Sequence, residues 1–75
     1  MSHASRASAP TFTVNGEPRP FAGPMSVADL LATLGLDGRK VAVERNEAIV
    51  PRSTYAQTLL APGDSLEIVH FIGGG

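Results

Sequence analysis

The sequence ends in SLEIVHFIGGG, residues 65–75, where an apolar run leads without a break into three glycines. The run is rich in β-branched and aromatic residues, which predicts a strand over 65–72. Glycine loses the most conformational freedom when it is fixed, so residues 73–75 are expected to form a flexible tail. Such a tail either frays or carries its carboxylate into the active site of a partner. Composition alone favours the frayed end.

A turn and a hairpin flank this strand in the predicted fold. Pro62-Gly63-Asp64 comes just before the strand and predicts a type II turn, because proline presets φ and glycine accepts the positive φ that follows. Far upstream, residues 11–14 alternate polar and apolar side chains, as a half-buried strand does. Asn15-Gly16 then predicts a type I′ hairpin turn.

The returning strand of the hairpin, residues 17–22, contains Pro18 and Pro20. Proline has no N–H to donate to a neighbouring strand. A strand with two prolines is therefore predicted to lie at an edge of the sheet.

Residues 25–36 carry the signals of a short amphipathic helix. Ser26 is the predicted N-cap, and Asp29 three residues later completes an acidic capping box. Gly35 fits the left-handed position that follows a helix. The apolar stripe expected to face a sheet is Val27, Leu30, Leu31 and Leu34.

Two more strands are predicted in the middle of the chain, at 41–45 and 48–50, joined by a tight turn at Asn46-Glu47. The segment 52–60 is ambiguous. One helical turn capped by Ser53 or Thr54 is expected there. The side chains expected to pack beneath it are Tyr55, Leu59 and Leu60.

The predicted order is hairpin, helix, strand, short strand and last strand, with the first and last strands side by side in parallel. This is an α+β roll of the β-grasp type, with a mixed four- to five-stranded sheet and one helix across one face. Residues 1–10 lack large apolar side chains and are expected to be a disordered extension. The predicted domain is 11–72, followed by the tail at 73–75.

Composition excludes several classes of protein. A chain of 75 residues allows one small domain, and 43% hydrophobic with 17% charged residues is too apolar for a disordered protein. A net charge of −1 gives no footprint for nucleic acid or an anionic membrane. The sequence has no cysteine, and no apolar run approaches the roughly 20 residues that span a bilayer. A cytoplasmic protein is expected.

With these elements in place, residues 11–75 resemble the ubiquitin-like sulfur carriers, most closely the thiamine-biosynthesis sulfur carrier family, ThiS. The terminal Gly-Gly behind a β-grasp pattern is the most specific part of the resemblance, and the Val-Pro-Arg after the fourth strand points to the thiamine branch. The matching stretches are VAVERN (41–46), AIVPR (48–52), PGDSLEI (62–68) and VHFIGGG (69–75).

The resemblance implies a function for the tail. In the family, an ATP-dependent adenylating enzyme of the E1 type uses MgATP to activate the terminal glycine. Sulfur from a cysteine desulfurase relay then forms a thiocarboxylate, which thiazole synthase uses to build the thiazole ring. Carried over, the reactive carbon belongs to Gly75, while Gly74 and Gly73 thread the partner's channel. The carrier itself is expected to be no enzyme and to hold no metal or cofactor.

The last strand also suggests a partner-binding surface. Period-two alternation places Val69 and Phe71 on the face away from the helix, beside the tail and Ile72. An apolar patch on an open sheet face is typical of a binding site. The alternative is that the 52–60 segment covers this patch.

Three charged or titratable residues are candidates for functional groups, but a structural or solvated role is expected for each. His70 is expected to be a partly buried structural histidine, because no serine or carboxylate lies at a suggestive spacing. Arg45 and Arg52 are expected to be solvated surface charges.

The sequence is also compatible with other classes of protein. A carrier of the molybdopterin pathway shares the fold and tail. A ubiquitin-like protein modifier would use the same Gly-Gly end to form an isopeptide bond. A plain β-grasp interaction module would need no functional tail.

Overall fold

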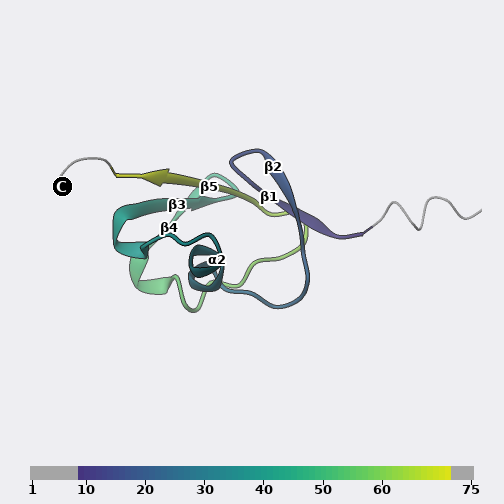
Figure 1. The fold of residues 1–75 in the computed structure, drawn as a ribbon, viewed down its shortest axis with the longest axis horizontal. Helices are drawn as coiled ribbons and strands as arrows, with labels where there is room; N and C mark the ends of the chain where they lie inside the picture. Colours follow the sequence, from purple (N-terminus) through teal and green to yellow (C-terminus); the bar gives the residue numbers. More distant parts are fainter. Residues whose placement is uncertain (1–8, 72–75) are drawn as a thin grey trace, which may run out of the picture.

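The computed structural model describes residues 9–71. Within them, five strands form one mixed sheet in the order β2-β1-β5-β3-β4, and one α-helix packs across one face (Figure 1). This confirms the predicted β-grasp roll and fixes the number of strands at five. The elements are β1 Thr11–Val14, β2 Glu17–Pro20, α2 Val27–Thr33, β3 Val41–Arg45, β4 Ala48–Val50 and β5 Ser65–His70.

The hairpin β1–β2 forms as predicted. Asn15 and Gly16 both have positive φ, 51° and 86°, which a type I′ turn requires. The proline-bearing strand β2 pairs only with β1 and lies at the edge of the sheet. It ends at Pro20, two residues earlier than expected.

Strand β5 lies in the centre of the sheet, parallel to β1 and antiparallel to β3. Asn15 directly follows β1 and extends the contact between β1 and β5 beyond the end of β1. Its backbone N–H donates to the Leu66 carbonyl at 2.8 Å. Its side-chain oxygen accepts from the Ile68 N–H at 2.8 Å, while its amide nitrogen donates to the Ile68 carbonyl at 3.2 Å. The hairpin turn thus holds β5 in register.

Helix α2 has the predicted caps at both ends. The Ser26 hydroxyl accepts from the Asp29 N–H at 3.0 Å, and the Asp29 carboxylate accepts from the Ser26 N–H at 3.0 Å. At the other end, Gly35 has a φ of 72° and the Leu36 N–H donates to the Leu31 carbonyl, which closes a Schellman motif. The helix is seven residues long and depends on packing against the sheet for stability.

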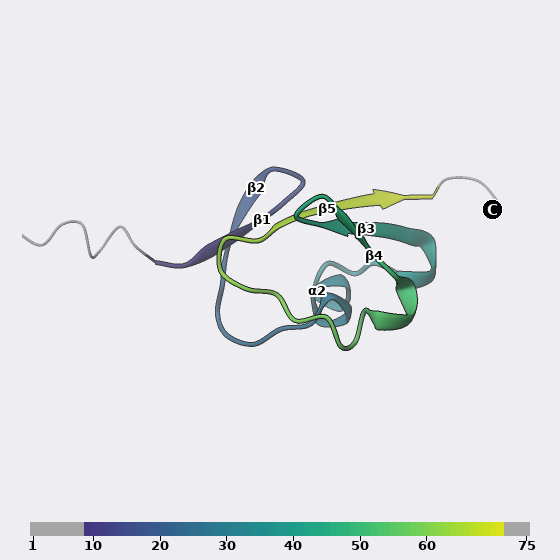
Figure 2. The same cartoon turned by 180° about the vertical axis from the view of Figure 1, so that it is seen from behind.

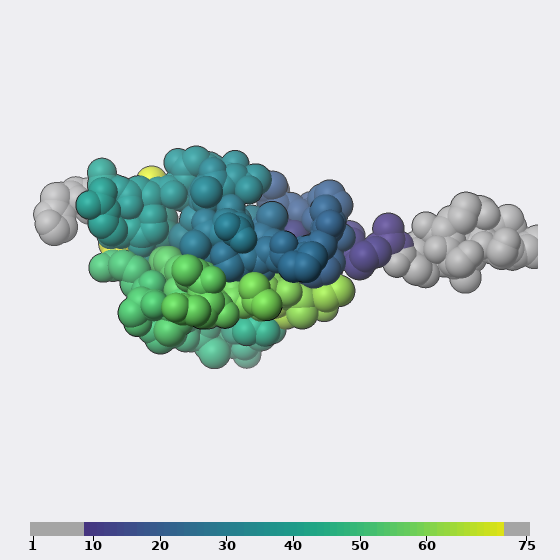
Figure 3. Space-filling view, turned by 90° about the horizontal axis from the view of Figure 1, so that it is seen from below, coloured from purple at the N-terminus to yellow at the C-terminus, as the bar shows by residue number. Residues whose placement is uncertain are grey.

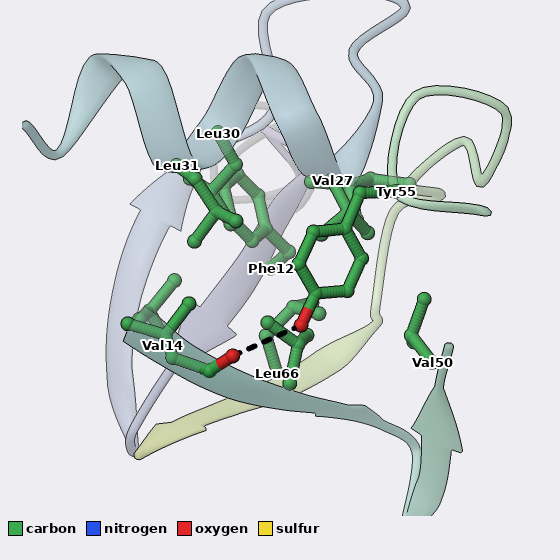
Figure 4. Close-up of a cluster of buried hydrophobic side chains, with 11 residues drawn as sticks. Phe12, Val14, Val27, Leu30, Leu31, Val50, Tyr55 and Leu66 are labelled. Carbon is green, nitrogen blue, oxygen red and sulfur yellow. Dashed lines mark hydrogen bonds between the residues drawn. The ribbon is translucent and has the colours of Figure 1, made fainter. Parts of the chain in front are cut away.

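The core lies between α2 and the sheet (Figure 4). The helix contributes the predicted stripe, of which Val27, Leu30 and Leu31 are buried. Leu66, on the central strand, has no exposed surface. The Tyr55 ring fills the space beside the helix, and its hydroxyl donates to the Val41 carbonyl at 3.2 Å.

The segment between β4 and β5 runs alongside α2 (Figure 3). It starts with a 3₁₀-helix at Arg52–Thr54, but Pro51 is the N-cap residue and no side chain caps the turn, so the predicted Ser53 or Thr54 cap is wrong. The prediction for Leu59 is also wrong, because its side chain is 59% exposed. Leu59 forms a β-bridge with Ser26, and extended pairing turns alternate side chains outward. Tyr55 and Leu60 are buried, as predicted.

The turn before β5 contains a buried carboxylate. Gly63 has a φ of 86° and the Asp64 N–H donates to the Ala61 carbonyl, as the predicted type II turn requires. The Asp64 side chain accepts hydrogen bonds from Arg45 Nε at 2.9 Å, from Asn46 Nδ2 at 3.0 Å and from the Ala61 N–H at 2.8 Å.

The bonds to Asp64 connect the β3–β4 turn to the start of β5. Burial raises the pKa of Asp64, but the hydrogen bonds from Asn46, Ala61 and Arg45 outweigh it and hold the pKa below its ordinary value. Arg45 is therefore a structural partner of Asp64, and the expectation that it is a plain solvated charge is wrong.

Candidate functional site

The open face of β5 carries the two apolar side chains predicted for the partner-binding surface. Val69 is 62% exposed and Phe71 is 50% exposed. Figure 2 shows that α2 and the segment 51–64 lie together on the opposite side of the sheet. The alternative that the 52–60 segment covers this patch is therefore wrong.

Neighbouring strands extend the exposed apolar surface. In the register between β3 and β5, Ala42 lies opposite Val69. On β4, Ile49 is 76% exposed and lies opposite Glu44 of β3. Ala42 and Ile49 were not predicted as part of this surface. The alternation of side chains along 41–45 and 48–50 predicts their position, because it places Ala42 and Ile49 on the face opposite to the buried valines of the same strands.

The backbone that follows β5 is held by a hydrogen bond at Phe71, the last described residue. The Phe71 N–H donates to the Lys40 carbonyl at 2.8 Å, so the pairing with the chain before β3 continues one residue past the strand. The remaining predicted site residues lie outside the described residues, and their roles stay predictions: Ile72, Gly73, Gly74 and Gly75.

His70 does not match its prediction, because it is exposed rather than partly buried. It lies at the end of β5, beyond the last turn of α2, which ends at Thr33. A groove of about 260 Å³ opens there, lined by His70 and by apolar side chains that include Leu34, Leu36 and Ile68. The groove therefore lies between the residues that follow α2 and the end of β5.

The described part of the chain offers no metal site and no membrane span. Among residues 9–71, no group of three or more His, Asp or Glu side chains is placed to hold a metal ion. In the same residues, no helix has the length and apolar character needed to cross a bilayer. The side chain of Asp37 is 35% exposed, and hydrogen bonds from Arg39 lower its pKa to about 2. These two residues form an ion pair with an N–O distance of 3.1 Å.

Comparison with known protein families identifies the chain. The family model described as "ThiS family" matches residues 12–75. The chain belongs to the ThiS family. This agrees with the resemblance seen in the sequence and with the observed β-grasp fold.

Individual relatives of this ThiS family chain support the assignment. It is 44% identical over 50 residues to the "Sulfur carrier protein ThiS" of Bacillus subtilis, covering 67% of this chain and 76% of that protein. The crystal structure of the thiamine biosynthesis protein ThiS of Geobacter metallireducens superposes with a TM-score of 0.73 at 34% identity. That match covers 87% of this chain and 99% of the other.

Two further relatives are longer proteins. The chain is 61% identical over 62 residues to a protein named "Thiazole synthase" from Paramagnetospirillum magneticum, and 48% identical to one of the same name from Magnetococcus marinus. Each match covers 83% of this chain, which spans about a fifth of the length of these relatives, 19% in both. In these proteins a ThiS-like segment is one part of a larger polypeptide.

Proposed function

We propose that this chain is a sulfur carrier of thiamine biosynthesis and that the carboxylate of Gly75 is its working group. The observation that carries the proposal is the family match, which runs through the β-grasp domain to residue 75. The relative from Bacillus subtilis is named a sulfur carrier protein. The solved ThiS structure with the same fold is titled a thiamine biosynthesis protein.

The chemistry begins with a carboxylate that resists nucleophiles. A C-terminal carboxyl group has a pKa of about 3.3–3.7 and is anionic at neutral pH. An adenylating enzyme of the E1 type joins one carboxylate oxygen to the α-phosphate of ATP, with release of pyrophosphate, and MgATP belongs to that enzyme. The terminal sulfur of a persulfide, supplied by a cysteine desulfurase relay, then attacks the carbonyl carbon and displaces AMP together with that oxygen. A thiol cleaves the resulting acyl disulfide and is itself oxidised to a disulfide. The product is a thiocarboxylate on Gly75.

The partner that consumes the sulfur is thiazole synthase. The support for this partner is that relatives 61% and 48% identical carry the matching segment within a chain of that name. Segments that occur in one polypeptide stay at high effective concentration, which suits the transfer of a group between them. The thiocarboxylate sulfur passes to the forming thiazole ring, and the carrier carboxylate is released for another cycle.

The tail glycines fit the demands of this transfer. A side chain at Gly74 would widen the thread that has to enter the active sites of two partners, whereas glycine offers bare backbone. Gly73 provides slack between β5 and the channel. Val69, Phe71 and Ile72 form the docking surface, of which Val69 and Phe71 are exposed on the open face. Within residues 9–71 the carrier needs no acid, base or metal of its own.

Intact-protein mass spectrometry tests the proposal. The chain is incubated with its adenylating enzyme, MgATP and a sulfur source, and we expect one oxygen to be exchanged for sulfur. The matched control lacks only Gly74 and Gly75 and should keep the folded circular-dichroism spectrum without gaining sulfur. An unchanged wild-type mass would overturn the proposal. Covalent adducts on other proteins would indicate a protein modifier instead.

Deletion of the gene distinguishes a role in thiamine biosynthesis from one in the molybdopterin pathway. We expect deletion of the gene to create a thiamine requirement and to leave molybdenum enzymes active. The variant without Gly74 and Gly75 should fail to restore growth without thiamine. Loss of molybdenum enzymes with normal thiamine synthesis would place the carrier in the molybdopterin pathway instead.

A further inference from the structure

Two carboxylates lie opposite each other on the open face of the sheet. Glu44 of β3 and Glu67 of β5 are direct partners in the antiparallel register. Directly opposite side chains have Cβ atoms about 4.5–5.5 Å apart, and like charges in that position destabilise a sheet. Within the domain, this pair therefore costs stability.

No cation in the described part of the chain compensates the pair. The ion pairs within residues 9–71 join Arg39 to Asp37 and Arg45 to Asp64. Arg45 is adjacent to Glu44 in β3, so its side chain points to the other face, where Asp64 holds it. The two carboxylates have no ion-pair partner among these residues.

Apolar side chains surround the acidic pair. Ile49 is the partner of Glu44 on β4, and Val69 lies two residues beyond Glu67 on β5. Neighbouring strands are about 4.8 Å apart, and alternate residues of one strand about 7 Å apart. The pair and its apolar neighbours therefore form one continuous patch.

We propose that this patch docks an apolar surface of thiazole synthase that inserts one arginine side chain between Glu44 and Glu67. The proposal rests on the proposed function, because it takes thiazole synthase as the partner. A guanidinium presents several N–H donors in a planar fork and can bind both carboxylates, while its methylene stem lies along apolar side chains. The flanking Ile49 and Val69 exclude water from this charge pairing.

The negative charge of the patch favours a basic partner over a second copy of the chain. A second copy of the chain in a twofold dimer would place one acidic pair against another, which costs interaction energy. A partner surface with a basic residue at its centre has the complementary charge. Thiazole synthase is favoured because relatives hold the matching segment and thiazole synthase in one chain.

Isothermal titration calorimetry with the thiazole synthase of the same organism tests the inference. The variant replaces both residues, Glu44→Gln and Glu67→Gln, which keeps their shape and removes the charge. The matched control is Glu17→Gln, an exposed glutamate whose register partner is the buried Val14, so that it belongs to the other face. We expect the double variant to bind at least tenfold more weakly and to lose most of the salt dependence of binding. The control should bind like the wild type.

Thermal unfolding of the same variants distinguishes docking from a structural role. Removing two opposed charges should leave the Tm of the double variant equal to or above that of the wild type. Weaker binding together with equal or higher Tm supports the inference. A lower Tm, an unchanged Kd, no binding by the wild type, or a loss of binding to the adenylating enzyme alone would each overturn it.

A failure of this inference can be distinguished from a failure of the proposed function. The mass-spectrometric assay for the thiocarboxylate uses the adenylating enzyme and no thiazole synthase. If the wild type gains sulfur and the Kd for thiazole synthase is insensitive to Glu44 and Glu67, the inference alone fails. If the wild type gains no sulfur, the carrier function itself fails.

Discussion

Asn in place of Asp64 should destabilise the domain strongly. The Asp64 side chain is 7% exposed and accepts three hydrogen bonds, of which two meet one oxygen and the third, from Asn46 Nδ2, meets the other. In Asp64→Asn, the new amide nitrogen would face the Asn46 nitrogen. Asn46 cannot turn its amide to compensate, because its own oxygen accepts from the Ser65 N–H at 2.9 Å. One bond is lost and two lose their charge assistance.

The magnitude follows from these bonds. Hydrogen bonds to charged groups contribute about 1.5–3 kcal/mol and neutral ones about 1 kcal/mol. Because the Arg45 side chain is 35% exposed, the lower end of the charged range applies, and one lost bond with two weakened ones costs about 3 kcal/mol in total. For a domain of this size, that corresponds to a fall in Tm of roughly 12–24 °C. Circular dichroism during heating at pH 7 measures it. The control is Asp37→Asn, which removes the partner of the exposed Arg39 and should shift Tm far less.

The stabilisation that Asp64 provides should decrease at low pH. The folded pKa of Asp64 lies below its ordinary value, so the stabilisation is present above the unfolded pKa of about 3.9 and is lost as the pH falls through the folded pKa. The difference in Tm between the wild type and Asp64→Asn should therefore narrow below about pH 4. Asp37 is present in both proteins and cancels. A gap no larger than that of Asp37→Asn, or one unchanged down to pH 3, would refute the reasoning.

Three further changes probe the rest of the fold by urea unfolding. Asn15→Gly keeps the positive φ but removes both side-chain hydrogen bonds to Ile68, and should lower the free energy of unfolding by about 1–2 kcal/mol. An unchanged urea midpoint would show that the Asn15 amide does not hold β5. Tyr55→Phe leaves the ring but removes the buried bond to the Val41 carbonyl, for an expected loss of about 1 kcal/mol, whereas a more stable protein would contradict it. Ser26→Ala removes the N-cap and should cost about 1 kcal/mol, with Ser65→Ala, an exposed serine in β5, as the neutral control.

The parts of the fold with local sequence signals were predicted from the sequence. The caps of α2 depend on Ser26, Asp29 and Gly35, whose geometry is fixed by neighbours a few residues away. The turns at Asn15-Gly16 and Pro62-Gly63 have the same local origin. The alternation along β5 located the exposed Val69 and Phe71.

The wrong cap at Ser53 or Thr54 is a local failure, but other failures concern contacts between distant residues. Nothing in the sequence near Arg45 shows that Asp64, 19 residues later, lies buried beside it. Leu59 turns outward because its backbone pairs with Ser26, which no local pattern reveals. The Glu44–Glu67 pair likewise depends on the register of β3 and β5, although the alternation within each strand assigns both side chains to the open face.

The central place of β5 sets the order in which the domain is able to fold during synthesis. Its partners β1 and β3 are made first, but they do not pair with each other, because β5 lies between them. The parallel pair Thr13↔Ser65 closes a loop of most of the domain, and such long-range pairings slow folding. A nascent chain that stops before residue 65 holds a hairpin, an unsupported helix and a second hairpin. The sheet therefore assembles only after the residues that lead into the glycine tail have left the ribosome.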